Sequence, residues 1–546
     1  MFKISSFKII DWLLVIVLVA GFSLQLYLLY YGYIIYNFLV PPGSDAISHY
    51  NIIKQILDTG SINFLTYPPG FHLLVILLSQ ISHVQPFDIL TYWTPALVVL
   101  PSLAMYFLLR QLFDHKTSTL TTLIFLLTSG YPLYGFIDGN YPDILAYGVF
   151  AILLFAFIIR YLKTKNTINL IIAGVFLVLI AFTHHLTFVS IAVILIIFGL
   201  VQLYILLVEK RLKVNFSHWK FLATASGFIL ILLSLFLAVK IYGPIIIRFI
   251  NGFLNNNPAV QDKYLNMLPN WPDYALMAGN PIWYLGVFGL LFLLVTTFKE
   301  RREIGAKQLV LVWITFYFLM SRLGATGFPA RFARELAPAL TVCIGFLLNY
   351  IFNLNSLRIH RYKMIFGYGL IGFLIITNSA IYVGPARIPD SFKLMVWFLP
   401  KDQEILNFIN SNVQIRYQIL YNPFANLYIP IKTTDNWNPI LLDSDQLALA
   451  QMTYKNDNYH YHGYENLSLA SRKKLTGYEK MIYDLSKQYG NYKYVYVGNL
   501  PPSNPDPTVY PKYAQFDIYK KVLYDLSSNG DLVKKFSDGS LLIKMY

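Results

Sequence analysis

The sequence predicts a mostly α protein, with a polytopic helical membrane domain and a smaller α/β domain at its C-terminal end. Apolar residues make up 56% of the 546 residues and charged residues only 13%, about half the share usual in soluble domains. The mean hydropathy is +0.51. Long apolar runs recur over residues 1–383, and the composition changes after that point. We therefore expect a transmembrane domain over 1–383 and a soluble domain over 384–546.

Eleven apolar runs are long enough to cross a bilayer, which takes about 20 helical residues. They are centred on 9–31, 87–109, 117–135, 143–162, 168–183, 186–208, 221–241, 282–298, 308–321, 335–353 and 365–383. The apolar run 70–82 is too short to cross, and we expect it to lie at or dip into the outer interface. About eleven transmembrane helices follow from this pattern.

Basic residues predict the orientation of these helices. Residues 1–383 hold 25 Lys and Arg against 13 Asp and Glu, and 18 of the 25 fall on alternate connections. Because short basic loops stay in the cytoplasm, we expect a multi-pass protein of the cell membrane with its N-terminus inside and residues 384–546 outside. A basic excess spread over loops, without a concentrated patch, excludes a nucleic-acid surface. Cys343 is the sole cysteine, so no intramolecular disulfide can form.

The segment from Pro400 onward alternates helical and β-rich stretches, as a small α/β domain does. We expect helices over 402–410 and 478–488, and strands over 418–421, 493–498 and 541–546. Asn466 begins an N-glycosylation acceptor pattern, Asn-Leu-Ser, on the side predicted to be external.

Polar residues gather where apolar runs emerge on the outer side, and the stretch 41–72 is the longest such interruption near the N-terminus. Asp45 and His49 are four residues apart on a predicted helix, so both side chains project from one face. Asp58 lies on the same stretch, and further candidates lie on other outer loops: Asp138, Asp143, His184, His185, Asp262, Asp273, and Glu335 beside Arg331 and Arg334. Several separate loops thus present ionisable groups at one membrane face, as an active site under the outer leaflet requires.

Each candidate also has a purely structural interpretation. Asp45 or Ser44 would cap the helix that follows, and Asp138 and Asp143 flank a Gly-Asn-Tyr-Pro turn in which Asp is an ordinary turn former. The two histidines would be interfacial residues at a helix end. Arg331 and Arg334 share a helix face and would either extend to the interface or bind a lipid phosphate.

The layout and three short segments carry a family resemblance. A basic N-terminus, one helix, a long external loop with an early Asp, a second external loop with further Asp, and an external C-terminal domain resemble the GT-C superfamily of polyprenyl-phosphate-dependent glycosyltransferases. Its members include oligosaccharyltransferases, protein mannosyltransferases and aminoarabinose transferases. Gly43-Ser44-Asp45, Tyr67-Pro68-Pro69-Gly70-Phe71-His72 and Thr183-His184-His185 look like segments of uncharacterised archaeal and bacterial members.

The resemblance implies a glycosyltransferase that moves a sugar from a polyprenyl-phosphate donor to an external protein, lipid or glycan acceptor. Asp45 matches the catalytic Asp of the first loop, and Asp138 or Asp143 the second-loop acid that holds a divalent cation in some members. Two features depart from the family. The WWDYG-type signature of oligosaccharyltransferases is absent, with only Asp435-Asn436-Trp437-Asn438 near it, and Ala46 follows Asp45 where protein mannosyltransferases have an acid.

From these observations we predict three sets of site residues. Asp45 acts on a proton or holds a metal, with His49, Asp138 and Asp143 as the other catalytic candidates. Mg or Mn would bind to Asp45, Asp143 and His184. The expected binding residues for the donor's lipid phosphate and the substrates are Arg331, Arg334, Arg248, His72 and His185.

Two other classes of function remain open from the sequence. A polytopic transporter or lipid flippase would place ionisable groups along a midplane path and often contain inverted repeats, and neither is clear here. A non-catalytic GT-C-like protein would bind glycan or lipid phosphate without turnover.

Overall fold

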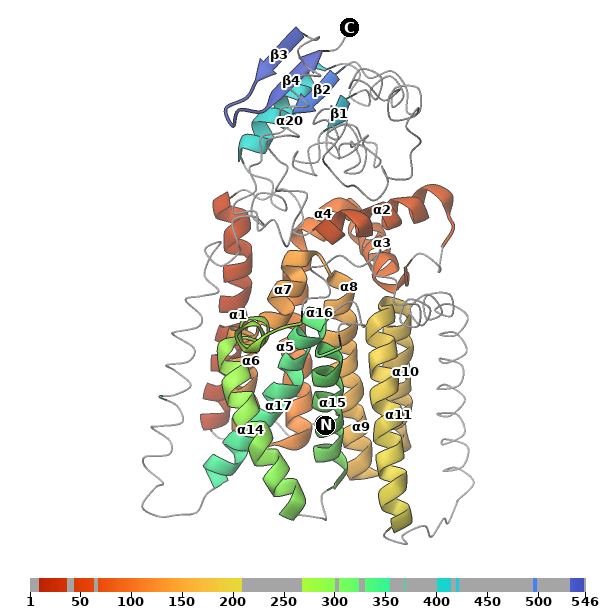
Figure 1. Cartoon of the computed structure of the whole chain (residues 1–546), viewed down its shortest axis with the longest axis vertical. Coiled ribbons are helices and arrows are strands. Elements are labelled where there is room, and N and C mark those ends of the chain that lie inside the picture. The colour runs from red at the N-terminus through yellow and green to blue at the C-terminus, as the bar shows by residue number, and fades with distance from the viewer. Residues whose placement is uncertain are drawn as a thin grey trace, which may run out of the picture. The chain divides into compact units, whose positions relative to one another are not determined.

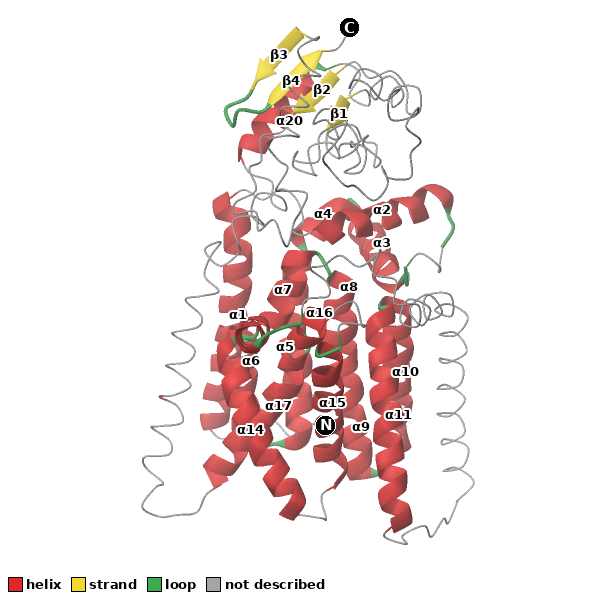
Figure 2. Cartoon of the chain, in the orientation of Figure 1, coloured by secondary structure: helices red, strands yellow, loops and turns green. Residues whose placement is uncertain are grey.

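The computed structural model describes residues 9–36, 44–62, 67–208, 268–299, 304–323, 329–353, 369, 400–413, 419–421, 494–497 and 531–544. The chain divides into two compact units. One is formed by Met1–Tyr31 with Asp45–Gly384, and the other by Gly32–Ser44 with Pro385–Tyr546. The first is helical, and the second contains a small sheet (Figures 1 and 2).

Helices account for nearly all of the described first unit. In chain order they are α1 (Ile9–Tyr36), α2 (Ser44–Thr59), α3 (Gly70–Ser82), α4 (Pro86–Tyr92), α5 (Thr94–Leu112), α6 (His115–Thr128), α7 (Gly130–Asp138), α8 (Tyr141–Asp143), the π-helical segment η2 (Ile144–Ala151), α9 (Ile152–Thr164), α10 (Thr167–Thr183), α11 (His185–Val208), α13 (Trp271–Ala278), α14 (Asn280–Lys299), α15 (Ile304–Ser321), α16 (Pro329–Arg334) and α17 (Leu336–Asn353). Figure 1 shows the long helices side by side, with α2 and α4 lying across one end of them.

Five helical stretches are long and apolar enough to cross a membrane. They are Thr94–Leu112, Tyr141–Thr164, His185–Ile205, Asn280–Thr297 and Pro329–Asn353. α3 and α4 together would make a sixth, but they are bent by 104° where they join. The predicted spans at 221–241 and 365–383 lie outside the described residues. The described part of the chain thus has five or six such spans, and three shorter apolar helices at Leu14–Tyr27, Thr167–Thr183 and Gly305–Ser321, against the eleven expected.

Short polar signals set several helix starts. Asp114 precedes α6 and accepts a hydrogen bond from the Thr117 backbone N–H at 2.8 Å. Asn270 and Asp273 form a capping box at the start of α13. Because its carboxylate caps its own helix, Asp273, an outer-loop candidate, has a structural role.

The core of the bundle is built mainly from aliphatic side chains of α5, η2, α9, α15, α17 and neighbouring helices, and its largest fully buried side chains are aromatic. α14 and α17 pack together most closely along their length. A Cβ placed on Gly289 would lie 2.5 Å from the Cys343 carbonyl oxygen, so only glycine permits this approach.

The described part of the second unit is a helix and a four-stranded sheet. α20 spans Pro400–Asn412, and the strands are β1 (Ile419–Tyr421), β2 (Tyr494–Val497), β3 (Asp531–Lys535) and β4 (Leu541–Lys544). Their order is β1-β2-β4-β3, with β1 and β2 parallel and the other pairs antiparallel. Four of these elements lie where the sequence predicts them, and β3 was not expected. The predicted helix 478–488 and Asn466 lie outside the described residues.

Candidate active site

Asp143 is the centre of a buried ionic cluster. It ends α8, directly before η2, and its side chain is fully buried. An Arg331 Nη2 lies 3.1 Å from its Oδ1, and an Arg334 Nη2 lies 3.6 Å from its Oδ2. Gly139, at φ +79°, ends α7 in the left-handed region and turns the chain toward Asp143. π-helical segments recur at functional sites, and η2 follows this carboxylate without a break.

α16 brings both arginines to the same carboxylate. Arg331 and Arg334 are three residues apart, so they share one face of this short helix. Arg331 also donates from Nε to Glu335 Oε1 at 3.0 Å. Two guanidinium groups therefore face two buried carboxylates, and the formal charges balance. The Arg331 side chain is 17% exposed, whereas those of Asp143 and Glu335 are at most 1% exposed.

Neutral polar groups complete the surroundings of Arg331. His184, between α10 and α11, has its Nε2 2.9 Å from an Arg331 Nη2. Its Nδ1 lies 2.8 Å from Thr187 Oγ1, and that hydroxyl donates to Asp143 Oδ1 at 2.9 Å. Asn140, with its amide oxygen turned toward Arg331, accepts at 3.0 and 3.2 Å. The cluster thus joins α8, α11, α16 and the connections beside them.

Tyrosine hydroxyls hold the backbone of the cluster. Tyr131 donates to the Asp143 carbonyl oxygen at 3.1 Å, and Tyr147 donates to the Glu335 carbonyl oxygen. Trp313 Nε1 donates to the Tyr147 hydroxyl at 3.0 Å. These three aromatic residues are almost entirely buried. The ionic groups therefore pack against a layer of aromatic side chains that solvent does not reach.

The first loop contributes a pair of buried histidines. His49 Nδ1 of α2 lies 3.1 Å from His72 Nε2 of α3, and the side chains are 4% and 0% exposed. Burial, and to a smaller extent His72, lowers the pKa of His49 well below its ordinary value. The Tyr67 ring packs edge-on against His49 at 5.3 Å and His185 at 5.5 Å between ring centroids. The first loop therefore contacts the α10–α11 connection through aromatic rings.

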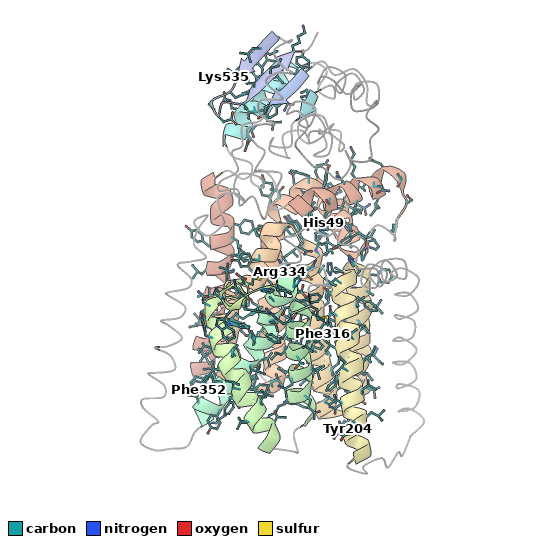
Figure 3. The ribbon with its side chains drawn as sticks, in the orientation of Figure 1. His49, Tyr204, Phe316, Arg334, Phe352 and Lys535 are labelled. Carbon is teal, nitrogen blue, oxygen red and sulfur yellow. The ribbon has the colours of Figure 1, made fainter. Side chains whose placement is uncertain are left out.

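Gly70 permits this contact. A Cβ at Gly70 would lie 2.7 Å from the Phe182 carbonyl oxygen and 3.0 Å from Thr183 Oγ1. The start of α3 can therefore lie directly on the end of α10, two residues from His184. Figure 3 labels His49 on α2 and Arg334 on α16 within this helical unit.

The other predicted site residues occupy different positions. Asp45 lies in the first turn of α2, and its side chain is exposed, in contrast with Asp143. α2 begins at Ser44, so Asp45 lies inside the helix and interacts favourably with the positive helix end. Asp138 is the last residue of α7, and the structure describes its backbone but not its side chain. Arg248 lies outside the described residues. His185 stacks on His184 with ring centroids 5.3 Å apart.

The donor set around Asp143 does not suit a divalent cation. Among the described residues, no three His, Cys, Asp or Glu side chains are grouped to hold a metal. Both Asp143 oxygens face guanidinium groups, and His184 Nε2 faces Arg331. A cation there would displace an arginine or lie against its positive charge, so Asp143 and His184 do not fit the predicted Mg or Mn.

Three members of the cluster, Asn140, Thr187 and Glu335, were not in the predicted sets of site residues, although Glu335 was noted among the outer-loop acids. Thr187 lies three residues after His184, in the first turn of α11, and Glu335 lies four residues after Arg331. The Glu335 spacing is readable from the sequence, because residues i and i+4 pair on a helix. The contact between Thr187 and Asp143 joins residues 44 positions apart, and no local pattern indicates it.

Comparison with known families assigns about three fifths of the chain to one family. A family model described as a family of unknown function, DUF6541, matches residues 10–333. The chain belongs to the DUF6541 family. The matched region runs from α1 through Asp45, Asp143 and His184 to Arg331, so it contains most of the ionic cluster. No curated protein sequence matches the chain.

Solved structures similar to this DUF6541 chain include an archaeal oligosaccharyltransferase and ArnT. The Archaeoglobus fulgidus oligosaccharyltransferase aligns in its apo form with a TM-score of 0.58 at 13% identity, over 88% of this chain and 69% of that one. The same archaeal enzyme, AglB, in complex with an inhibitory peptide and a dolichol-phosphate, aligns with a TM-score of 0.58 at 12% identity, over 97% and 74%. ArnT from Cupriavidus metallidurans bound to undecaprenyl phosphate aligns with a TM-score of 0.54 at 12% identity, over 97% of each chain.

At these identities the comparisons establish a shared fold. The expected mostly helical architecture is therefore confirmed, because the chain shares its fold with these proteins. A further structure of the archaeal enzyme is a complex with Zn and sulfate. That metal belongs to the archaeal enzyme, and the Asp143 surroundings described above give it no counterpart.

Proposed function

We propose that this protein is an integral-membrane glycosyltransferase of the GT-C type, which transfers a sugar from a polyprenyl-phosphate donor to an acceptor outside the cytoplasm. The observation that carries the proposal is the buried ionic cluster with a partly exposed Arg331, in a fold shared with enzymes whose structures contain polyprenyl phosphates. The uncharged rings of Tyr67, His49 and His72 from the first loop lie beside this cluster.

Arg331 is proposed to receive the phosphate of the donor lipid. A guanidinium group is planar and always charged, and it binds phosphate oxygens through paired hydrogen bonds. Arg331 is the most exposed of the four charged groups in the cluster. Asp143 and Glu335 fix the direction of its guanidinium group before the lipid arrives, which is the preorganisation that electrostatic stabilisation needs.

Asp45 is proposed to act as the base. Its carboxylate, four residues before His49 on α2, is exposed and can take a proton from an acceptor hydroxyl or amide. The acceptor atom then forms a bond to the anomeric carbon of the sugar, and the bond from that carbon to the phosphate oxygen breaks. The electron pair leaves with the polyprenyl phosphate, whose added charge Arg331 stabilises.

Asp143 is assigned the supporting role in this scheme. Arg331 and the Thr187 hydroxyl contact one oxygen of its carboxylate, and Arg334 lies 3.6 Å from the other, so the carboxylate is held within the cluster and faces its arginines. A substitution at Asp143 should therefore act first on folding and on the position of Arg331.

A transfer assay with a labelled donor tests the proposal. Membranes of the host organism that contain the overproduced protein would receive a polyprenyl-phosphate sugar labelled in the sugar. Wild type should release polyprenyl phosphate and move the label to an acceptor. Asp45→Asn should lower the rate about 100-fold or more, as expected when a general base is lost. Asp58→Asn provides the matched control, because Asp58 is also an exposed acid of α2.

Two results would contradict the assignment. Equal rates for folded wild type and Asp45→Asn would exclude Asp45 as the base. Label that crosses a proteoliposome membrane without cleavage of the sugar–phosphate bond would indicate a lipid flippase instead of a transferase.

A further inference from the structure

Four side chains of the cluster form a closed ring of contacts. Arg331 Nη2 lies 2.9 Å from His184 Nε2, His184 Nδ1 lies 2.8 Å from Thr187 Oγ1, Thr187 Oγ1 lies 2.9 Å from Asp143 Oδ1, and Asp143 Oδ1 lies 3.1 Å from Arg331 Nη2. We propose that Thr187 is a positioning residue whose hydroxyl closes this ring, holds His184 as its Nδ1–H tautomer and keeps Asp143 against Arg331.

The tautomer follows from the donor capacity of arginine. A guanidinium group only donates hydrogen bonds, so His184 Nε2 must accept the one from Arg331. A neutral imidazole with an accepting Nε2 carries its proton on Nδ1. That N–H points at Thr187 Oγ1, which accepts it, and the single hydroxyl proton of Thr187 is then directed to Asp143. Every contact in the ring has one donor and one acceptor.

The other neutral tautomer satisfies fewer contacts. In it, Nδ1 would accept from the Thr187 backbone N–H at 3.2 Å, as a helix cap does. Its Nε2–H would then oppose the Arg331 guanidinium at 2.9 Å, and the Thr187 hydroxyl would have one proton for two acceptors. Protonation of both nitrogens creates the same conflict with Arg331. In the ring with Nδ1–H, only the longest of these contacts, between the Thr187 backbone N–H and Nδ1 at 3.2 Å, lacks an acceptor.

Thr187 thereby controls the group proposed to bind phosphate. Asp143 Oδ1 accepts from Arg331 and from Thr187, which restrains the carboxylate from two directions. Without the hydroxyl, the carboxylate loses one restraint and the His184 N–H loses its acceptor. Loss of the Thr187 hydroxyl should therefore also weaken the binding of lipid phosphate to Arg331. This expectation rests on the proposed function, whereas the ring itself does not.

The first test reads the tautomer directly. Protein labelled with ¹⁵N-histidine in lipid bilayers would be compared by solid-state NMR for wild type, Thr187→Val, Thr187→Ser and Thr183→Val, with His184→Gln to assign the signal. Wild type and Thr187→Ser should show one neutral His184 species protonated at Nδ1, and Thr187→Val should lose that single species. Thr183→Val is the matched control, because the Thr183 hydroxyl bonds only to the Leu179 carbonyl oxygen of its own helix in the contacts described. A wild-type His184 protonated at Nε2, or at both nitrogens, would overturn the proposal.

The second test measures binding of polyprenyl phosphate to the same purified variants. Thr187→Val should weaken binding roughly tenfold, the loss expected for one hydrogen bond to a charged group, and Thr187→Ser should restore it. Equal affinities of wild type and a folded Thr187→Val would overturn the positioning role. Absence of binding by wild type would overturn the proposed function, and the NMR result would still decide whether the ring exists.

Discussion

Asp143 and Asp45 are chemically alike but lie in opposite environments. Asp143 is fully buried between two arginines, and Asp45 is exposed in the first turn of a helix. Removing one charge from a buried, balanced set leaves its partners uncompensated, whereas removing an exposed carboxylate leaves the fold intact. Substitution of Asp143 should therefore lower stability, and substitution of Asp45 should lower activity without lowering stability.

Asp143→Asn should lower the free energy of unfolding by about 3–5 kcal/mol, because Arg331 and Arg334 would both lose a buried carboxylate. Thermal or denaturant unfolding of the detergent-solubilised protein measures this. Asp114→Asn is the matched control, since asparagine also caps a helix well. A loss for Asp143→Asn no larger than for Asp114→Asn would show that the cluster is not a stabilising ion network.

His49 should make stability depend on pH. Its folded-state pKa lies below its unfolded value of about 6.5, so the unfolded chain binds the extra proton as the pH falls. Above about pH 6.5, His49 is neutral in both the folded and the unfolded chain and has no effect on stability. Below that pH, the free energy of unfolding falls by up to about 1.4 kcal/mol per pH unit. Melting temperatures at pH 5.5 and 7.5 should differ less in His49→Gln than in wild type. His83→Asn, an exposed position, should leave the difference unchanged; an unchanged difference in His49→Gln as well would refute the assignment.

At the scale of elements, the site depends on how closely α3 approaches α10. The carbonyl oxygen of Phe182 occupies the space in which a side chain at Gly70 would lie. This contact brings the first loop, with His49 and His72, beside the connection that carries His184.

Gly70→Ala should push α3 away from α10, because its Cβ would lie 2.7 Å from a backbone oxygen that cannot rotate aside. We expect a loss of about 1–3 kcal/mol in stability. The matched control is Gly199→Ala in α11, where a Cβ meets no atom within 4 Å and helix propensity favours alanine. Unfolding curves of both variants test this, and equal stabilities would indicate that the contact tolerates a methyl group.

The sequence predicted most described helices because an apolar run of 15 to 25 residues has few alternatives in a membrane. It did not predict the 104° bend between α3 and α4 or the π-helical segment after Asp143. Both depend on packing against other helices. At the site, Arg331, Arg334, Asp143 and His184 were predicted from their places on outer loops, and the structure brings all four together. Thr187 was missed because its partner is distant in sequence, and Asp45 and Asp143 were not distinguished because burial is a tertiary property.

At the scale of the whole molecule, residues 384–546 are predicted to lie outside the cell, after a membrane domain formed by residues 1–383. Basic residues concentrate on alternate connections of residues 1–383, which favours an external position for the sheet of the second unit. Cys343 is buried, so reagents should label it slowly and engineered cysteines can report the topology.

Asp538→Cys, in the turn between β3 and β4, should react with a membrane-impermeant maleimide in intact cells. Lys163→Cys, exposed near the end of α9, should react only after permeabilisation. Mass spectrometry or gel shift measures the labelled fraction. The opposite pattern would reverse the orientation predicted from the basic loops, and with it the external location of the proposed site.

The central claim is that a polyprenyl phosphate binds with its phosphate against Arg331, on the side where Asp45 of α2 can reach the sugar. Electron cryo-microscopy of the protein in lipid nanodiscs with added polyprenyl phosphate measures this directly. We predict phosphate density within hydrogen-bonding distance of the Arg331 guanidinium, with the Arg331–His184–Thr187–Asp143 ring retained. Lipid phosphate density located elsewhere, with Arg331 in contact only with Asp143, Glu335, Asn140 and His184, would contradict the account.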